Sequence, residues 1–163
     1  MNGTNADDLR DPSRLGLISA STWRVASPLA TLTKRSVRAL ARVADLPNWD
    51  WAAAPCLRSR LAVGVPATPE TLSRIEVAED AVREVLELGP EVAFRVRRLP
   101  GGVGIVALEG GVLRGKRGEE EGRRQLDEVA RRVGGFGFEE VRFEAFRSGE
   151  LAGVADVLEA ETS

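Results

Sequence analysis

A long helix with its own start and stop signals is the feature that most constrains the fold of this chain. Thr68 is placed to cap it, Pro69 occupies the first helical position, and Gly89-Pro90 stops it after about Leu88. At roughly 100° per residue one apolar stripe forms, which contains Leu72, Ile75, Val82 and Leu86. Glu79 falls inside this stripe, where a carboxylate needs a partner. The pattern predicts a core-facing helix and marks Glu79 for attention.

The next segment predicts a β-hairpin. Residues 92–99 alternate, with Phe94 and Val96 on one face and Arg95 and Arg97 on the other. Pro100-Gly101-Gly102 is typical of a turn, and a second strand is predicted from residue 103 to 109.

After the hairpin, the glycine-rich segment 110–118 predicts an exposed loop. A second helix is predicted from about Glu119 to Val133, and a last strand from Val141 to Phe146. The buried face of this helix is expected to contain Leu126, Val129, Ala130 and Val133. The order helix, hairpin, helix, strand predicts an α/β fold: a small two-layer domain with helices on one face of its sheet.

The first half of the chain carries weaker signals. Its first thirty residues are polar and irregular, which predicts loops with one short helix. Thr33 is placed to cap a helix to about Ala44, and Pro47 ends it. Residues 46–66 then read as a linker. Within it, the stretch from Leu46 to Arg60 holds two tryptophans and the single cysteine, and it is either the wall of a site at a domain boundary or an ordinary linker.

Composition excludes several classes of function. The net charge of −2 argues against a nucleic-acid binder. One cysteine and no histidine exclude an internal disulfide, a multi-cysteine metal centre and histidine-based catalysis, so no metal site is expected. No apolar run is long enough to span a bilayer and the first residues do not resemble a signal peptide, so we expect a cytoplasmic protein.

The residues that suit chemistry are mostly arginines. Of the 23 basic residues only Lys34 and Lys116 are lysines, and arginine forms bidentate contacts with phosphate and carboxylate. Arg95, Arg97 and the Ser59-Arg60 pair are therefore candidates for an anionic ligand, with Glu79 orienting an arginine or accepting from a ribose hydroxyl. The alternative is a structural ion pair at Glu79. Cys56 is either a reactive thiol near Arg58 and Arg60 or a small buried apolar residue.

The order of short motifs resembles the ATP-dependent sacrificial sulfur transferase (LarE) family of the PP-loop superfamily, which makes the thiocarboxylate precursor of a nickel-pincer cofactor. The similar motifs run in the family's order along nearly the whole chain. They are GTNADDL at 3–9, SPL at 27–29 with LTK at 32–34 and VRALA at 37–41, LPNWD at 46–50, PCLRSR at 55–60, TPE at 68–70, Ala78-Glu79, RVR at 95–97, Gly137-Phe138, and FRSG at 146–149.

This resemblance implies a substrate, a chemistry and a division into domains. The substrate is a mononucleotide with carboxylates on a pyridinium ring, which is adenylated and then receives sulfur from a protein cysteine. Residues 1–45 correspond to the last part of a Rossmann-like PP-loop domain, 46–66 to a linker, and 67–163 to an α/β domain for substrate binding and oligomerisation. In this family the substrate phosphate is gripped at the positions of Ser59, Arg60, Glu79, Arg95 and Arg97, and Cys56 lies in the stretch that supplies the sulfur.

Other positions follow from the same comparison. Thr4, Asn5, Asp7 and Asp8 fall on the nucleotide side of the family's site, and Arg147 and Ser148 are further candidates. The glycine-rich SGG-x-DS loop that binds ATP in this family has no counterpart in the sequence. ATP and Mg are therefore expected only through a separate PP-loop chain, and no bound cofactor is expected in this chain alone.

Three hypotheses remain open. The first is the C-terminal half of a split, oligomeric sulfur transferase, inactive without its partner chain. The second is a non-catalytic ligand-binding or oligomerisation module derived from that family. The third is a truncated product without activity.

Overall fold

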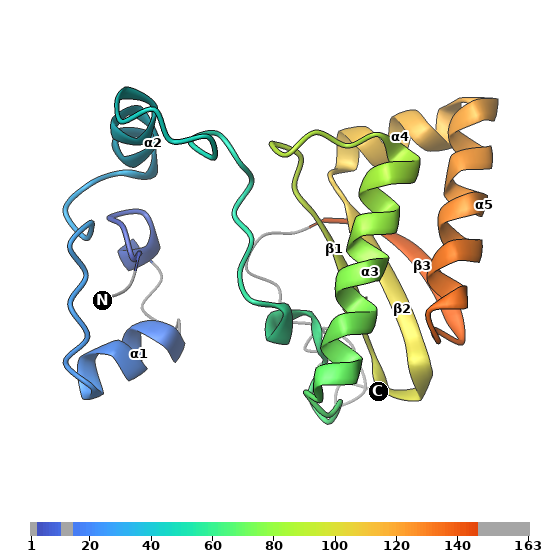
Figure 1. Ribbon diagram of the computed structural model, residues 1–163, viewed down its shortest axis with the longest axis horizontal. Helices are drawn as coiled ribbons and strands as arrows, with labels where there is room; N and C mark the ends of the chain where they lie inside the picture. The colour runs from blue at the N-terminus through green and yellow to red at the C-terminus, as the bar shows by residue number, and fades with distance from the viewer. Residues whose placement is uncertain (1–2, 11–14, 147–163) are drawn as a thin grey trace, which may run out of the picture. The chain divides into compact units, whose positions relative to one another are not determined.

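The chain divides into two compact units, Met1–Trp51 and Ala52–Ser163. A computed structural model describes residues 3–10 and 15–146 (Figure 1). The division falls inside the expected linker: residues 46–51 group with the first unit, and residues 52–66 with the second. Arg147 and Ser148 lie outside the described residues.

The first unit contains short helices joined by turns. They are η1 at Asp8–Arg10, α1 at Leu15–Thr22 and α2 at Lys34–Val43. Thr33 caps α2, because its hydroxyl accepts a hydrogen bond from the backbone N–H of Ser36 at 3.1 Å. The short early helix and the cap at Thr33 confirm the predictions for this region.

The first unit has no core among its described residues. Among the residues of this unit whose burial is described, none is buried, and no strand is present in its described part. Trp23, Leu40 and Val43 are 77%, 57% and 86% exposed. Apolar side chains spaced for one helix face therefore do not guarantee a core, because the face also needs an element to pack against.

The second unit is a two-layer α/β domain, as predicted. Its long helices are α3 at Pro69–Leu86 and α5 at Glu120–Gly135, and its strands are β1 at Phe94–Arg98, β2 at Val103–Leu108 and β3 at Glu140–Ala145. The sheet order is β1-β2-β3, in which β1 and β2 form the predicted antiparallel hairpin and β3 runs parallel to β2. A parallel pair needs a crossover, which α4 at Gly110–Gly118 and α5 supply.

One continuous core joins the helices to the sheet. The helices α3 and α5 lie over the same face of the sheet (Figure 1). The fully buried side chains of the core come from both layers: Ile75, Val82 and Leu86 on α3, Val96 on β1, Val106 and Leu108 on β2, and Val129 and Val133 on α5. This is the core that the alternation of β1 and the stripe of α3 predict.

The prediction of an exposed loop at residues 110–118 is wrong, because this segment forms the helix α4, Gly110–Gly118. Leu113 is buried against the core, and Lys116 donates through Nζ to the side chain of Gln125 on α5. A Cβ at Gly122 would lie 2.4 Å from the carbonyl oxygen of Lys116, so a glycine lets the start of α5 approach α4. Packing against α5 thus outweighs the poor helix propensity of four glycines.

The hairpin turn confirms the prediction for Pro100-Gly101-Gly102. Gly101 and Gly102 have φ values of 71° and 77°, a region that favours glycine. The backbone N–H of Leu99 donates to the carbonyl of Val103 at 2.8 Å and closes the turn.

Candidate functional site

Glu79 accepts hydrogen bonds from two elements that pack beside α3. Its Oε1 accepts from Nε of Arg60 at 2.9 Å and from the backbone N–H of Val96 at 3.1 Å, and its Oε2 accepts from Nη2 of Arg60 at 3.3 Å. The side chains of Arg60 and Glu79 are 3% and 18% exposed. Of the alternatives that the sequence left open, the structure shows the ion pair, within a bond network that joins α3 to the edge of β1.

Arg60 belongs to a short turn that carries Cys56. This turn is η2, Leu57–Arg60, with Cys56 at its N-terminal cap position. Nη1 of Arg60 donates to the carbonyl of Pro55 at 2.6 Å and to the hydroxyl of Ser59 at 3.0 Å. That hydroxyl donates in turn to the carbonyl of Cys56 at 2.8 Å.

The chain then pairs with the sheet. Leu61 forms a parallel bridge with Arg98, and the backbone N–H of Ala62 donates to the carbonyl of Arg98 at 3.0 Å. Residues 55–62 therefore run beside the outer edge of β1, which is an edge strand of the sheet.

Arg95 also binds the segment before Cys56, at Ala53. It donates through Nη2 to the carbonyl of Ala53 and through Nη1 to that of Phe94, and its guanidinium lies 5.2 Å from the centre of the Phe146 ring. Two arginines, Arg60 and Arg95, thus hold the backbone on the N-terminal side of Cys56.

Positive charge exceeds negative charge in this cluster. Burial lowers the pKa of Arg95 below its ordinary value, the positive charge of Arg60 and then that of Arg97 add to this, and Glu79 acts in the opposite direction. Arg97 is buried, with 9% of its surface exposed. The cluster thus contains three guanidinium groups and one carboxylate, and Arg97 takes part in a further interaction. Guanidinium groups are suited to an anionic ligand. We call Arg60, Glu79, Arg95 and Arg97 the arginine cluster.

Cys56 is exposed at the surface of the second unit. The alternative in which it is a small buried apolar residue is therefore wrong. Its thiol is accessible to a reagent or a substrate, and the carbonyls on both sides of it are held by Arg60 and Ser59.

The nucleotide-side candidates belong to the first unit, where they form local structure. The side chain of Asn5 accepts from the N–H of Asp7 at 2.9 Å, and that of Asp8 accepts from the N–H of Asn5 at 3.1 Å. Asp7 accepts from the N–H of Lys34 at 2.7 Å and so satisfies the start of α2. Thr4 also takes part in an interaction. These polar residues fix a turn and a helix start.

Several contacts around these segments have no signal in the sequence. Arg38 on α2 donates to the carbonyls of Asp50 and Trp51 at 3.3 and 2.9 Å, and the guanidinium of Arg42 lies 5.1 Å from the ring centre of Trp49. The acceptors for Arg38, and those at Ala53 and Pro55, are backbone carbonyls. Any residue type supplies such an acceptor, so only the folded structure identifies them.

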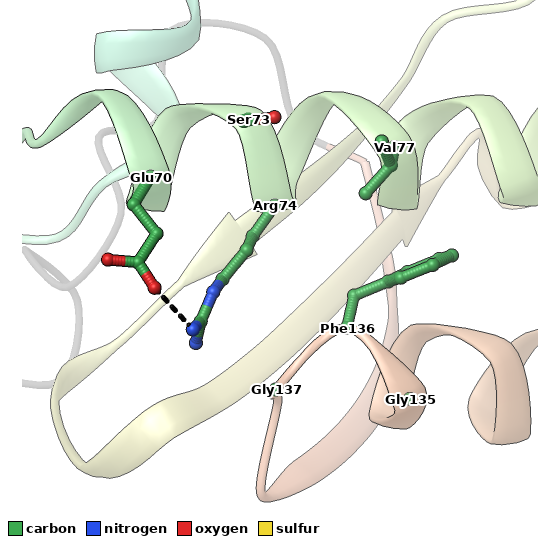
Figure 2. A pocket seen from close by; sticks show the side chains of 7 residues that line it. All are labelled: Glu70, Ser73, Arg74, Val77, Gly135, Phe136 and Gly137. Carbon is green, nitrogen blue, oxygen red and sulfur yellow. Dashed lines mark hydrogen bonds and ion pairs between the residues drawn. The ribbon is translucent and has the colours of Figure 1, made fainter.

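A separate surface pocket lies between α3 and the turn after α5 (Figure 2). Its volume is about 490 Å³. On the α3 side of the pocket, Nη2 of Arg74 donates to the carboxylate of Glu70 at 2.6 Å. The remaining lining residues are Ser73, Val77, Gly135, Phe136 and Gly137. None of the candidate site residues lines this pocket.

Neither a metal-ligand cluster nor a membrane-crossing helix is found among the described residues. Within residues 3–10 and 15–146, no group of three or more His, Cys, Asp or Glu side chains is arranged to hold a metal ion. No helix in the described part of the chain has the length and apolar character that a bilayer crossing requires.

The chain is similar to part of a known protein. No protein-family model matches the chain. Over 87 residues it is 41% identical to a protein of Synechocystis sp. (strain ATCC 27184 / PCC 6803 / Kazusa) named "Uncharacterized protein slr1717". This match covers 52% of the present chain and 32% of the Synechocystis protein. The chain is thus similar to about a third of that longer relative.

Proposed function

We propose that this chain is the acceptor-holding part of a LarE-like, ATP-dependent sacrificial sulfur transferase that acts in the cytoplasm with a separate PP-loop chain. The observation that carries the proposal is the arginine cluster next to Cys56, because Arg60 and Arg95 both bind the segment 53–56. An excess of guanidinium groups suits the phosphate of a mononucleotide, and an exposed thiol suits attack on its activated carboxylate.

The proposed reaction has three steps. On the partner chain, ATP adenylates a carboxylate of the pyridinium ring, and pyrophosphate leaves. The Sγ of Cys56 attacks the acyl carbon, the thiol proton goes to solvent, and AMP leaves, so that a thioester joins the substrate to the protein. Loss of the Cα proton of Cys56 and cleavage of its Cβ–S bond then release the thiocarboxylate and leave dehydroalanine at this position. Magnesium would be held with ATP on the partner chain.

Arg95 and Arg97 are the residues that we assign to the substrate phosphate. They stand two residues apart on β1, where their partners in the β2 register are Ala107 and Ile105. Two guanidinium groups on one face of a strand match the several oxygens of a phosphate. This contact fixes the substrate next to the segment that carries the thiol.

The first unit supports the partner chain in this proposal. Residues 1–45 would complete the Rossmann-like PP-loop domain of the partner, with Asp7 and Asp8 on its nucleotide side. Leu40 and Val43 on α2 are exposed, and none of the first-unit side chains with described burial is buried. Exposed apolar side chains of this kind are typical of a surface that another element covers.

The experiment is a reconstitution with a candidate partner that carries the SGG-x-DS loop. ATP, Mg and nicotinate mononucleotide carrying a second ring carboxylate are added, and the peptide that contains Cys56 is weighed by mass spectrometry. Loss of one H₂S from this peptide is expected only when ATP and the partner are present. The matched control is Cys56→Ser, which retains a polar group but has no sulfur to lose. An unchanged mass in the complete mixture contradicts the proposal.

A second candidate is a non-catalytic module that binds the same class of ligand. It is favoured by the position of the arginine cluster, which lies wholly within the second unit and does not need the first. A pyridinium mononucleotide would then raise the melting temperature, Arg97→Ala would abolish this shift, and no partner would bring about sulfur loss.

A further inference from the structure

We infer that Arg60 and Glu79 are positioning residues, which lock the backbone on both sides of Cys56 onto the edge of β1, and that they are not part of the anion grip. This inference rests on the proposed function, because it assigns a role to two residues next to the proposed sulfur donor. It divides the arginine cluster into a locking pair, Arg60 and Glu79, and a binding pair, Arg95 and Arg97.

The donors of Arg60 are committed to protein acceptors. Nε and one N–H of Nη2 donate to Glu79. Nη1 donates to the carbonyls of Pro55 and Cys56 and to the hydroxyl of Ser59. A guanidinium has five N–H groups, so at most one remains. Because Arg60 is also only 2% exposed, an anion has neither donors nor access at this side chain.

Glu79 joins three elements at one carboxylate. It lies on α3, it pairs with Arg60 of η2, and it accepts from the N–H of Val96 on β1. Substitution of Glu79 by a residue without an acceptor would leave a buried guanidinium and an edge-strand N–H unsatisfied at the same time. The η2 turn would then lose its side-chain attachment to α3.

The result for Cys56 is a fixed backbone. The carbonyl of Pro55, which precedes it, accepts from Arg60, and its own carbonyl accepts from Ser59. Both peptide groups that flank Cys56 are therefore hydrogen-bonded, and the direction of the thiol depends mainly on rotation about χ1. Such restriction is what a nucleophile needs in order to meet a bound acyl group at the required angle.

The test uses the single cysteine of the chain as a specific labelling site. A nitroxide is attached to Cys56 of the full chain, and the mobility of the label is measured by electron paramagnetic resonance. Glu79→Gln and Arg60→Lys are expected to shift the spectrum towards the mobile form. The matched controls are Glu70→Gln and Arg74→Lys, an exposed pair on the same helix, which are expected to leave the spectrum unchanged.

A milder variant keeps the test valid if the buried substitutions unfold the domain. Ser59→Ala removes the side-chain hydrogen bond to the carbonyl of Cys56. The backbone N–H of Ser59 still donates to that carbonyl at 3.0 Å, and the Arg60–Glu79 pair stays in place. The label on this variant is expected to show intermediate mobility, with a circular dichroism spectrum like that of the wild type. A wild-type spectrum for a folded Glu79→Gln or Arg60→Lys protein would overturn the inference. If neither variant folds, a label that is already in the mobile form on the wild-type protein would overturn it.

Kinetics with the partner chain separate positioning from binding. Glu79→Gln and Arg60→Lys are expected to lower the rate of sulfur loss about tenfold to a hundredfold with little change in KM, because the thiol is misdirected. Arg97→Ala is expected to raise KM instead. A rise in KM for Arg60→Lys equal to that for Arg97→Ala would place Arg60 in the anion grip and refute the inference.

The two proposals fail in different ways. Absence of sulfur loss from the wild-type protein contradicts the sulfur transferase function, whereas the label at Cys56 still reports whether Arg60 and Glu79 hold the segment. Normal sulfur loss with unchanged label mobility in the variants contradicts only the positioning role.

Discussion

The two units of this chain differ in how they use apolar side chains. In the second unit, residues from α3, β1, β2 and α5 pack into one core, in which Ile75, Val106 and Val129 are fully buried. In the first unit, apolar residues such as Trp23 and Val43 are exposed. None of the residues of this unit whose burial is described is buried. Helical caps and apolar spacing are present in both units, so local signals do not by themselves produce a core. A sheet that two helices can cover makes the difference.

The largest effect is expected from removing core volume in the second unit. Leu108→Ala, at a side chain with no exposed surface, should lower the free energy of unfolding by about 4 kcal/mol, because it leaves a cavity between the layers. The same change at Leu40, which is 57% exposed, should cost less than about 0.5 kcal/mol. Urea denaturation measures both. Equal losses would show that the first unit also has a core.

The buried ion pair should give the next largest effect. Glu79→Ala leaves Arg60 without its partner in a buried place and is expected to lower the free energy of unfolding by about 3 kcal/mol. Glu70→Ala, which breaks an exposed pair on the same helix, should cost less than about 1 kcal/mol. A similar loss for the two variants in urea denaturation would show that the Arg60–Glu79 pair is not a lock.

Close packing of α4 on α5 gives a smaller effect. Gly122→Ala places a methyl group against the backbone of Lys116 and is expected to destabilise the second unit by about 2 kcal/mol. Gly115→Ala on α4 meets no atom within 4 Å and should instead stabilise the unit, by about 0.5 kcal/mol, through helix propensity. Thermal melts of the two variants distinguish these signs, and stabilisation by Gly122→Ala would contradict the packing.

A pH-dependent effect is expected on the exposed face of α5. Hydrogen bonds from Arg131 and then Arg132 lower the pKa of Glu128 from 4.5 to about 2. A lowered pKa in the folded state means that stabilisation is complete above pH 4.5 and is lost as the pH falls towards about 2. The melting temperature of Glu128→Gln should therefore lie below that of the wild type at neutral pH and converge with it in that interval. A constant gap across the interval would contradict the pairing.

The smallest effect on the isolated chain is expected from Leu40→Ser and Val43→Ser on α2. Both side chains are exposed, so the melting temperature should barely change. If this face is the contact with the partner chain, both variants should weaken association severalfold in titration calorimetry. Unchanged affinity would show that the partner chain does not bind at Leu40 and Val43. Weakened association would show that the apolar face of α2 in the first unit is covered by another chain, whereas the second unit folds around its own core.

Much of the fold could be predicted from the sequence because its signals are local. Thr33 and Thr68 cap helices within three residues, and the alternation of residues 94–98 indicates a strand. Segment 110–118 could not be predicted in the same way, since its glycines favour a loop and its helix forms only against α5. The candidate site shows a similar limit: the sequence marked Glu79 as a carboxylate that needs a partner, but the partner lies 19 positions away in a different element.

By itself, the sequence determined which residues form helices and strands with clear caps and periodicity, and it supplied arginines and one cysteine in the motifs described. Tertiary structure alone decided that Arg60 would pair with Glu79, that Cys56 would be exposed, and that the apolar face of α2 would not be buried. The physical reason is range. Caps and turns depend on hydrogen bonds and sterics within a few residues, whereas burial and charge pairing depend on which distant segments meet.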